Sequence, residues 1–297
     1  MEHMQMAPDL ALSRVALGFW RWKEWGLGID QLDKLVRDAL DLGITTFDHA
    51  NIYDEGNPET AFGEVLRRDP GLREQMQIIT KSTIVYPNEN IRVKYYDTSR
   101  EHTITEVEKS LKRLNTDYID LFLLHRPDPL MNAEETAEAF SELHAAGKVR
   151  HFGVSNYKPI QFDLLQSYLD LPLVTNQVEV SVLAHENFDD GTIAHAQTKR
   201  IHPIVWSPLA GGRIFNGTDE ASLRVREALE VVRVDLGAET IDEVAFAWLY
   251  RHPVGLIPIT GSCELEFIKR PIQALQYRLS QEQWFLIWSA ATGRKVL

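Results

Sequence analysis

The sequence is poor in cysteine, in basic residues and in long apolar runs. Cys263 is the only cysteine among 297 residues, which excludes an intramolecular disulfide and a zinc site built from cysteines, and is typical of a reducing compartment. The formal net charge is −12, so an extended surface for nucleic acid or anionic membranes is not expected. No segment has the roughly 18 apolar residues that span a bilayer. We therefore expect a protein with neither nucleic-acid nor membrane partners.

The first 20 residues lack the basic head and apolar core of a secretory signal, since they contain acidic residues and a proline. We therefore expect a cytoplasmic protein. A composition of 44% hydrophobic and 25% charged residues is typical of globular proteins with a sizeable core. Because no Pro-, Gly- or Ser-rich linker divides the chain, we expect residues 1–297 to form a single domain. We expect a monomer or a weak homo-oligomer.

Short apolar runs alternate with helical patterns along the chain, which is the pattern of repeated βα units around a parallel sheet. Eight runs predict strands, at 44–50, 76–82, 118–125, 149–156, 174–181, 202–209, 255–262 and 272–279. Eight such units in about 250 residues favour a single closed (β/α)8 TIM barrel, although strand count alone does not distinguish it from an open doubly wound sheet. We also expect a short N-terminal hairpin within 10–22 and a long loop after the second strand, at 83–98.

Polar side chains end consecutive predicted strands. Asp48 ends the first apolar run, Lys81 the second and His125 the third, and the later strands end or carry Asn156, Gln177, Trp206 and Ser207. Each residue alone has a structural explanation, such as a helix cap or a lysine that reaches solvent. In a parallel barrel, however, the C-terminal ends of the strands meet at one mouth. Together, these residues predict an active site there.

The residue types at this mouth have a coherent chemistry. Tyr53 follows Asp48 by five residues, and a tyrosine hydroxyl has a reference pKa of about 10. A nearby ammonium such as Lys81 lowers that pKa, and a carboxylate paired with the ammonium keeps it charged. His125 can donate a hydrogen bond to a substrate oxygen. Such a site suits protonation of an oxygen as negative charge develops on it.

Other chemistries lack their sequence signals. There is no G-x-S-x-G elbow for a serine nucleophile, and no G-x-G-x-x-G follows a strand as in a Rossmann domain. His125 and Asp128 are close in sequence, but no second histidine stands at helix ligand spacing. We expect no metal.

The motifs, in this order, resemble the aldo-keto reductase family and, most closely, its bacterial branch of uncharacterised oxidoreductases. The resemblance covers nearly the whole chain and rests on ALGFWRW (16–22), TTFDHANIYD (45–54), IITKS (78–82), VRHFGVSNY (149–157), TNQVEVS (175–181), WSPLAGGR (206–213), IPITGS (257–262) and QEQWFLIW (281–288). It implies a (β/α)8 barrel that binds NADP(H) without a Rossmann domain and reduces aldehyde or ketone carbonyls of small molecules.

The resemblance also implies roles for individual residues. Tyr53 is the general acid, Lys81 and Asp48 tune it, and His125 orients the carbonyl. Ser155, Asn156 and Gln177 correspond to residues that grip the nicotinamide carboxamide, and Trp206 to the aromatic residue on which the nicotinamide ring stacks. The expected cofactor-binding set is completed by Asp48, Gly18, Phe19, Trp20, Arg21, Ser207, Leu209, Gly212, Arg213, Gly261, Ser262 and Phe267.

One segment departs from the family pattern. Gly261 and Phe267 stand where family members carry basic residues that read the adenosine 2′-phosphate, and Glu264 adds a negative charge. Lys269 or Arg270 can supply the missing charge from a shifted position. The expected cofactor is NADP(H), with NAD(H) as the alternative. The alternative function is a nicotinamide-sensing regulatory subunit with little turnover, because potassium-channel β subunits use this fold chiefly as a partner.

Overall fold

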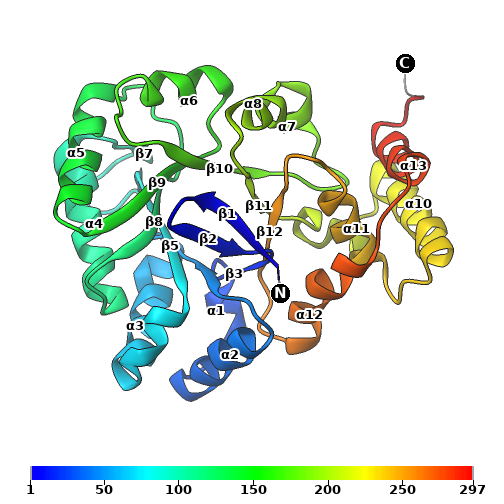
Figure 1. The fold of residues 1–297 in the computed structure, drawn as a ribbon, viewed down its shortest axis with the longest axis horizontal. Helices are drawn as coiled ribbons and strands as arrows, with labels where there is room; N and C mark the ends of the chain where they lie inside the picture. Colours follow the sequence, from blue (N-terminus) through cyan, green and yellow to red (C-terminus); the bar gives the residue numbers. More distant parts are fainter. Residues whose placement is uncertain (1, 296–297) are drawn as a thin grey trace.

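Eight parallel strands close into a barrel in the computed structural model, which describes residues 2–295 (Figure 1). The ring closes because Ile259 and Thr260 of the last strand pair with Ala16 and Leu17 of the first. The predicted closed (β/α)8 TIM barrel is therefore confirmed, and an open sheet is excluded. In ring order the strands are β3 (Ala16–Gly18), β4 (Thr46–Asp48), β5 (Gln77–Ser82), β8 (Ile119–Leu124), β9 (Val149–Ser155), β10 (Leu173–Glu179), β11 (Ile204–Trp206) and β12 (Ile257–Thr260).

Helices cover the outside of the ring (Figure 1). An example is α2, whose buried Leu32, Leu35, Val36 and Ala39 recur at helical spacing, and whose end is followed by Gly43 at φ 82°. Within residues 2–295, no helix is long and apolar enough to cross a membrane. The helices are α1 (Trp22–Trp25), α2 (Ile29–Asp41), α3 (Asn57–Arg68), α4 (Arg100–Leu114), α5 (Ala133–Ala145), α6 (Pro159–Gln166), α7 (Glu186–Asp189), α8 (Thr192–Lys199), α9 (Arg213–Asn216), α10 (Glu220–Leu236), α11 (Ile241–Tyr250), α12 (Leu265–Gln273) and α13 (Gln281–Thr292).

An antiparallel hairpin closes the N-terminal end of the barrel. It is made of β1 (His3–Ala7) and β2 (Leu10–Ser13), and it crosses the centre of the ring in Figure 1. Leu10 and Leu12 are buried in the same apolar cluster as the inward-facing strand residues Ile79, Leu121 and Ile257. A short hairpin over one end is therefore present as predicted, but it spans 3–13 rather than 10–22.

The predicted strand at 272–279 is wrong. The first two of these residues end α12, Ala274–Gln276 form the 3-10 turn η4, and 277–279 have no regular structure. Ala274 and Leu279 are buried in the apolar cluster under the helices. The apolar residues that suggested a strand therefore pack against the core from a helix end and a turn. The missing strand is β3, which has only three residues and lies within the segment assigned to the hairpin. Asp48 therefore ends the second barrel strand, and the long loop follows the third strand, β5.

That long loop, at 83–98, contains a small antiparallel ribbon. Its strands are β6 (Ile84–Val85) and β7 (Tyr95–Tyr96), which pair Ile84 with Tyr96 and Val85 with Tyr95. The ribbon follows the C-terminal end of β5, so it lies beside the mouth of the barrel. Ile84, Tyr86 and Lys94 from this segment line the cleft at that mouth.

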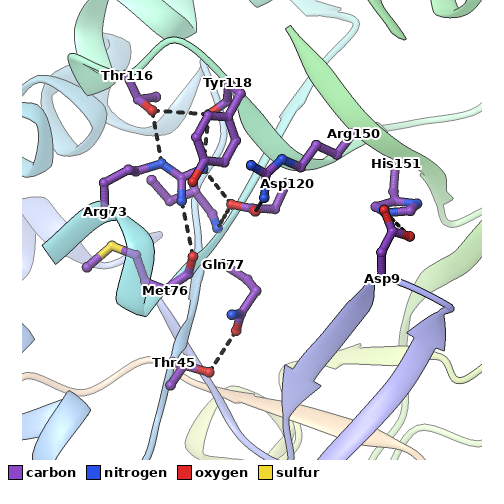
Figure 2. A network of polar contacts seen from close by, with 11 residues as sticks. Asp9, Thr45, Arg73, Met76, Gln77, Thr116, Tyr118, Asp120, Arg150 and His151 are labelled. Atoms are coloured by element: carbon purple, nitrogen blue, oxygen red, sulfur yellow. Dashed lines mark hydrogen bonds and ion pairs between the residues drawn. The ribbon is translucent and has the colours of Figure 1, made fainter. Parts of the chain in front are cut away.

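A buried ion pair ties the N-terminal ends of the strands together (Figure 2). The Arg73 guanidinium, from the 3-10 turn η2 (Pro70–Gln75), lies 2.6 Å from the Asp120 carboxylate. Asp120 also accepts a hydrogen bond of 2.9 Å from the backbone N–H of Ile78. The Tyr118 ring lies near two guanidiniums, 3.8 Å from Arg73 and 3.7 Å from Arg150. This network joins η2, β5, β8 and β9 at the end opposite the mouth.

We expect Asp120→Ala to lower the free energy of unfolding by about 3–5 kcal/mol, because it leaves the Arg73 charge buried without its carboxylate. Urea denaturation followed by circular dichroism measures the change. The matched control is Arg150→Gln, since the Arg150 side chain is 53% exposed and its loss should cost about 1 kcal/mol or less. Equal destabilisation by the two variants would contradict this assignment.

Candidate active site

The four predicted catalytic side chains come from the ends of three neighbouring strands and from the turn that follows the first of them, and they meet at the mouth. Asp48 is the last residue of β4, Lys81 lies near the end of β5, His125 directly follows β8, and Tyr53 opens the 3-10 turn η1 (Tyr53–Gly56). The Lys81 ammonium donates to Asp48 Oδ1 at 2.7 Å and lies 3.3 Å from the Tyr53 hydroxyl. The rings of Tyr53 and His125 meet edge to face, with centroids 5.9 Å apart.

Lys81 is fully buried, yet its environment keeps it charged. Burial favours the neutral amine, but the Asp48 carboxylate and Tyr53 more than offset burial and raise the pKa of Lys81 above its ordinary value. The His49 carbonyl accepts a further hydrogen bond of 2.6 Å from the ammonium. The site therefore contains a fixed positive charge directly beside the Tyr53 hydroxyl.

The pKa of Tyr53 moves opposite to the sequence-based expectation. Burial raises it, and the Asp48 charge raises it further, whereas Lys81 and Arg126 lower it by less. The net shift is upward, so the phenol is protonated at neutral pH. The Tyr53 hydroxyl therefore keeps its proton while it accepts a hydrogen bond from the Lys81 ammonium.

His125 is a neutral imidazole in this site. Burial, followed by the charges of Lys81, Arg126 and Lys94, lowers its pKa well below the ordinary value. Its Nδ1 is buried and has no hydrogen-bond partner within residues 2–295. A neutral histidine can donate one hydrogen bond to a substrate oxygen without adding a second positive charge near Lys81.

These residues border a cleft of about 540 Å³. Most of the predicted cofactor-binding residues line it, namely Gly18, Trp20, Arg21, Asp48, Ser155, Asn156, Gln177, Trp206, Ser207, Leu209, Gly212, Gly261, Ser262 and Phe267. Two predicted residues do not. Phe19 is fully buried in the core, and the Arg213 guanidinium is paired with Asp219 at 3.0 Å. Lys81 lies beneath the cleft, under Asp48 and Tyr53.

Amide and hydroxyl side chains form a continuous chain along one wall. Asn156 Nδ2 donates to Ser155 Oγ at 2.8 Å, and Ser155 Oγ donates to the backbone carbonyl of Gln177 at 2.8 Å. The Trp206 indole N–H donates to Asn156 Oδ1 at 3.0 Å. Gln177 Nε2 donates to Asp48 Oδ2 at 2.8 Å, so this wall is joined to the Lys81 ion pair.

The loop after β11 approaches the cleft with its backbone in unusual conformations. Ser207, Ala210, Gly211 and Gly212 all have positive φ, between 50° and 95°. Gly212 has the largest φ of the four, 95°, and a residue with a side chain would strain the backbone at this position. The two glycines, which carry no side chain, line the cleft beside Leu209 and leave room there for close approach of a ligand.

At the far end, the cleft is bordered by Gly261, Ser262 and Phe267, and by the buried carboxylate residue Asp242. Phe267 is half exposed. The Arg270 guanidinium is already paired with three carboxylates, Glu239 and Glu243 at 3.4 Å and Glu266 at 2.6 Å.

Sequence reasoning missed several residues of the cleft, including Arg126, Lys94, Asp242 and Phe215. Arg126 directly follows His125 in the sequence, and this position next to a predicted catalytic residue could have indicated that Arg126 lies in the cleft. Among the described residues, no group of three or more His, Cys, Asp or Glu side chains is arranged to hold a metal ion. The expectation of no metal stays a prediction.

His49 supports the site from behind. Its ring stacks on Phe19 with centroids 4.3 Å apart, and neither ring nitrogen has a hydrogen-bond partner within residues 2–295. Complete burial, together with the nearby Lys81 charge, lowers the pKa of His49 from 6.5 to about 3. The folded protein therefore requires a neutral His49, whose backbone carbonyl holds Lys81.

This pKa shift predicts that the protein becomes less stable as pH falls. Between pH 6.5 and 3 the unfolded chain binds a proton at His49 that the folded chain does not, so the His49 contribution to stability is lost as pH falls through this window. From pH 7 to pH 5, wild type should lose about 2 kcal/mol more unfolding free energy than His49→Phe, which keeps an aromatic ring on Phe19. Urea denaturation at both pH values measures the difference. An identical pH dependence would contradict the neutral buried histidine.

The chain matches the aldo/keto reductase family over residues 14–291. It is 49% identical over 296 residues to the uncharacterized oxidoreductase YcsN of Bacillus subtilis (strain 168), covering 99% of each chain. It is 40% identical over 305 residues to a 6-dehydroglucose reductase of Agrobacterium fabrum (strain C58 / ATCC 33970), covering 100% of both.

A solved structure of the thermostable aldo-keto reductase Tm1743, in complex with the inhibitor epalrestat, has a TM-score of 0.82 to this chain at 25% identity. The superposition covers 98% of this chain and 100% of the other. The resemblance inferred from the sequence motifs is confirmed. This chain is an oxidoreductase that belongs to the aldo/keto reductase family.

Proposed function

We propose that this enzyme reduces aldehyde or ketone carbonyls to alcohols with a nicotinamide cofactor, and that Tyr53 is the general acid. One observation carries the proposal: a buried ammonium, Lys81, contacts both a carboxylate and the Tyr53 hydroxyl at the base of a cleft. The raised pKa of Tyr53, caused by burial, supports a phenol that keeps its proton until a basic oxygen develops nearby.

The residues of the cleft wall fit a nicotinamide carboxamide and ring. Ser155, Asn156 and Gln177 offer donors and acceptors of the kind that a carboxamide needs, and Trp206 offers a flat indole face. The glycine-containing loop after β11, with Gly261 and Ser262, suits close approach to phosphate groups. When bound, the cofactor supplies a hydride to the carbonyl carbon.

The role that we propose for each catalytic residue follows from its charge. His125, neutral and next to Tyr53, donates a hydrogen bond that orients the carbonyl oxygen. As negative charge develops on that oxygen, the Tyr53 hydroxyl donates its proton, and Lys81 stabilises the phenolate that remains. Asp48 keeps Lys81 charged and aimed at Tyr53.

We expect Tyr53→Phe to lower kcat/KM for aldehydes by about 100- to 10,000-fold, because the phenol proton is lost while the ring remains. Loss of nicotinamide absorbance at 340 nm with a panel of aldehydes measures the rates. Cofactor affinity, followed by quenching of tryptophan fluorescence, should be nearly unchanged. Equal rates for the variant and wild type would contradict the catalytic role of Tyr53. Negligible turnover by wild type would favour the alternative function, a nicotinamide-sensing regulatory subunit.

For the cofactor, the sequence predicted NADP(H), with NAD(H) as the alternative, and the far end of the cleft supports the alternative. A 2′-phosphate needs an uncommitted cation, but Arg270 is shared among three glutamates. Lys269 is exposed and does not line the cleft. The carboxylate of Asp242 borders the cleft there, and such a group suits a ribose hydroxyl better than a phosphate.

We expect wild type to bind NADH at least as tightly as NADPH, because none of the described residues that line the Phe267 end of the cleft is a cation. The double variant Glu264→Lys, Phe267→Arg should shift the ratio of dissociation constants toward NADPH by about 10-fold or more, since it adds two cations at the α12 entrance. Fluorescence titration measures both constants. Glu264→Gln, Phe267→Leu is the matched control without added positive charge. Wild type binding NADPH 10-fold more tightly than NADH would refute the preference.

A further inference from the structure

Two cations at the substrate side of the cleft have no carboxylate partner. The Arg126 guanidinium lies over the Trp206 ring, 5.8 Å from its centroid, and the Lys94 ammonium lies 5.1 Å from the centroid of Tyr86. Both side chains line the cleft. Neither forms an ion pair within residues 2–295, and the Arg126 side chain donates no hydrogen bond there. Arg126 is half-buried, whereas Lys94 is exposed. In a chain with 43 acidic and 31 basic residues, a half-buried arginine without a carboxylate partner requires an explanation.

Other cations around the same cleft are neutralised. Arg21 pairs with Glu24 at 3.1 Å, and Arg213 pairs with Asp219 at 3.0 Å. Glu179 is close enough to Arg126 for that charge to lower its pKa, although burial raises the pKa of Glu179 overall. It still forms no ion pair with Arg126. The positive charge of Arg126 and Lys94 is therefore directed into the cleft.

Both cations lie beside the proposed reacting atoms rather than at the Phe267 end. Arg126 is adjacent to His125 in sequence, and its charge acts on the pKa of both Tyr53 and His125. Lys94 acts on His125 as well. An anionic group held by these cations would leave the rest of a small molecule within reach of Tyr53.

We propose that Arg126 and Lys94 form an oxyanion-binding subsite, and that the substrate is a carbonyl compound that also carries a carboxylate or a phosphate. This proposal rests on the proposed reductase function. A guanidinium donates two parallel hydrogen bonds to either oxyanion, and a half-buried guanidinium binds an anion more strongly than an exposed one. The ammonium of the exposed Lys94 adds a point charge of the same sign.

The kinetic test uses matched pairs of probes. The carboxylate pair is 4-carboxybenzaldehyde and its neutral methyl ester, and the phosphate pair is glyceraldehyde 3-phosphate and glyceraldehyde. For wild type we expect kcat/KM to favour the anionic member of at least one pair. In Arg126→Gln the anionic-to-neutral ratio should fall on the order of 10- to 100-fold, and in Lys94→Gln by a smaller factor.

The matched control is Arg92→Gln, because Arg92 is exposed in the same loop and does not line the cleft. Its ratio should equal that of wild type. A fall confined to one pair identifies carboxylate or phosphate as the group that is bound. An unchanged ratio in Arg126→Gln, or a wild-type preference for both neutral members, would overturn the proposal.

A binding measurement separates this proposal from the reductase function. Calorimetry compares benzoate with neutral benzamide, and inorganic phosphate with no ligand, on wild type and Arg126→Gln with NADH or NADPH present. Tighter binding of an anion by wild type, lost in the variant and weakened by 0.5 M NaCl, supports the subsite. This support for the subsite stands even if no carbonyl compound is reduced. That outcome would contradict only the reductase proposal. If Arg126→Gln instead weakens cofactor binding and leaves anion binding unchanged, Arg126 contacts the cofactor and the subsite is refuted.

Discussion

The site depends on one buried charge, the ammonium of Lys81. Removing an ammonium from water costs several kcal/mol, and this cost is offset by the Asp48 carboxylate at 2.7 Å and the His49 carbonyl at 2.6 Å. The second oxygen of Asp48 accepts from Gln177 of β10, which lies on the opposite side of the ring from β4. The charge thus fixes side chains from facing strands relative to each other, and so sets the geometry at the base of the cleft.

The two ends of the barrel have separate tasks. At the N-terminal end, the β1–β2 hairpin fills the opening with leucine side chains, and the Arg73–Asp120 pair joins the strand starts. At the other end, the polar residues follow or end strands whose interiors are buried and apolar. This separation is general in parallel barrels, where the C-terminal ends carry the chemistry. It lets the cleft hold buried charge and backbone with positive φ, because stability is supplied elsewhere.

Much of the barrel could be predicted because long buried strands leave a clear apolar pattern. Seven of the eight strands lie at predicted positions, and the side chains of Asp48, Lys81 and His125 converge as expected from strand ends. The three-residue strand β3 was missed, since a run this short has no periodicity of its own and is defined by its neighbours β4 and β12. The apolar positions at 272–279 were misassigned because helix and strand cannot be distinguished in short runs.

Properties that depend on several charges at once could not be read from the sequence. The sequence indicated that Lys81 would lower the pKa of Tyr53, but the degree of burial, which only the fold determines, outweighs that charge. Likewise, nothing in the residue types separates Arg270 from Arg126. The fold surrounds Arg270 with three glutamates and leaves Arg126 without a carboxylate partner among the described residues.

This difference between the two arginines gives the cleft an electrostatic direction. At the Phe267 end, committed cations and the Asp242 carboxylate make the cleft unfavourable for a 2′-phosphate. Beside Tyr53, the uncommitted Arg126 and Lys94 make it favourable. Because charges in a low-dielectric cleft interact more strongly than in water, an anionic group on a substrate is drawn toward the proposed reacting groups. In the proposed reaction, the same field stabilises the negative charge that develops on a carbonyl oxygen beside Tyr53, so one arrangement of charge favours both substrate binding and charge development.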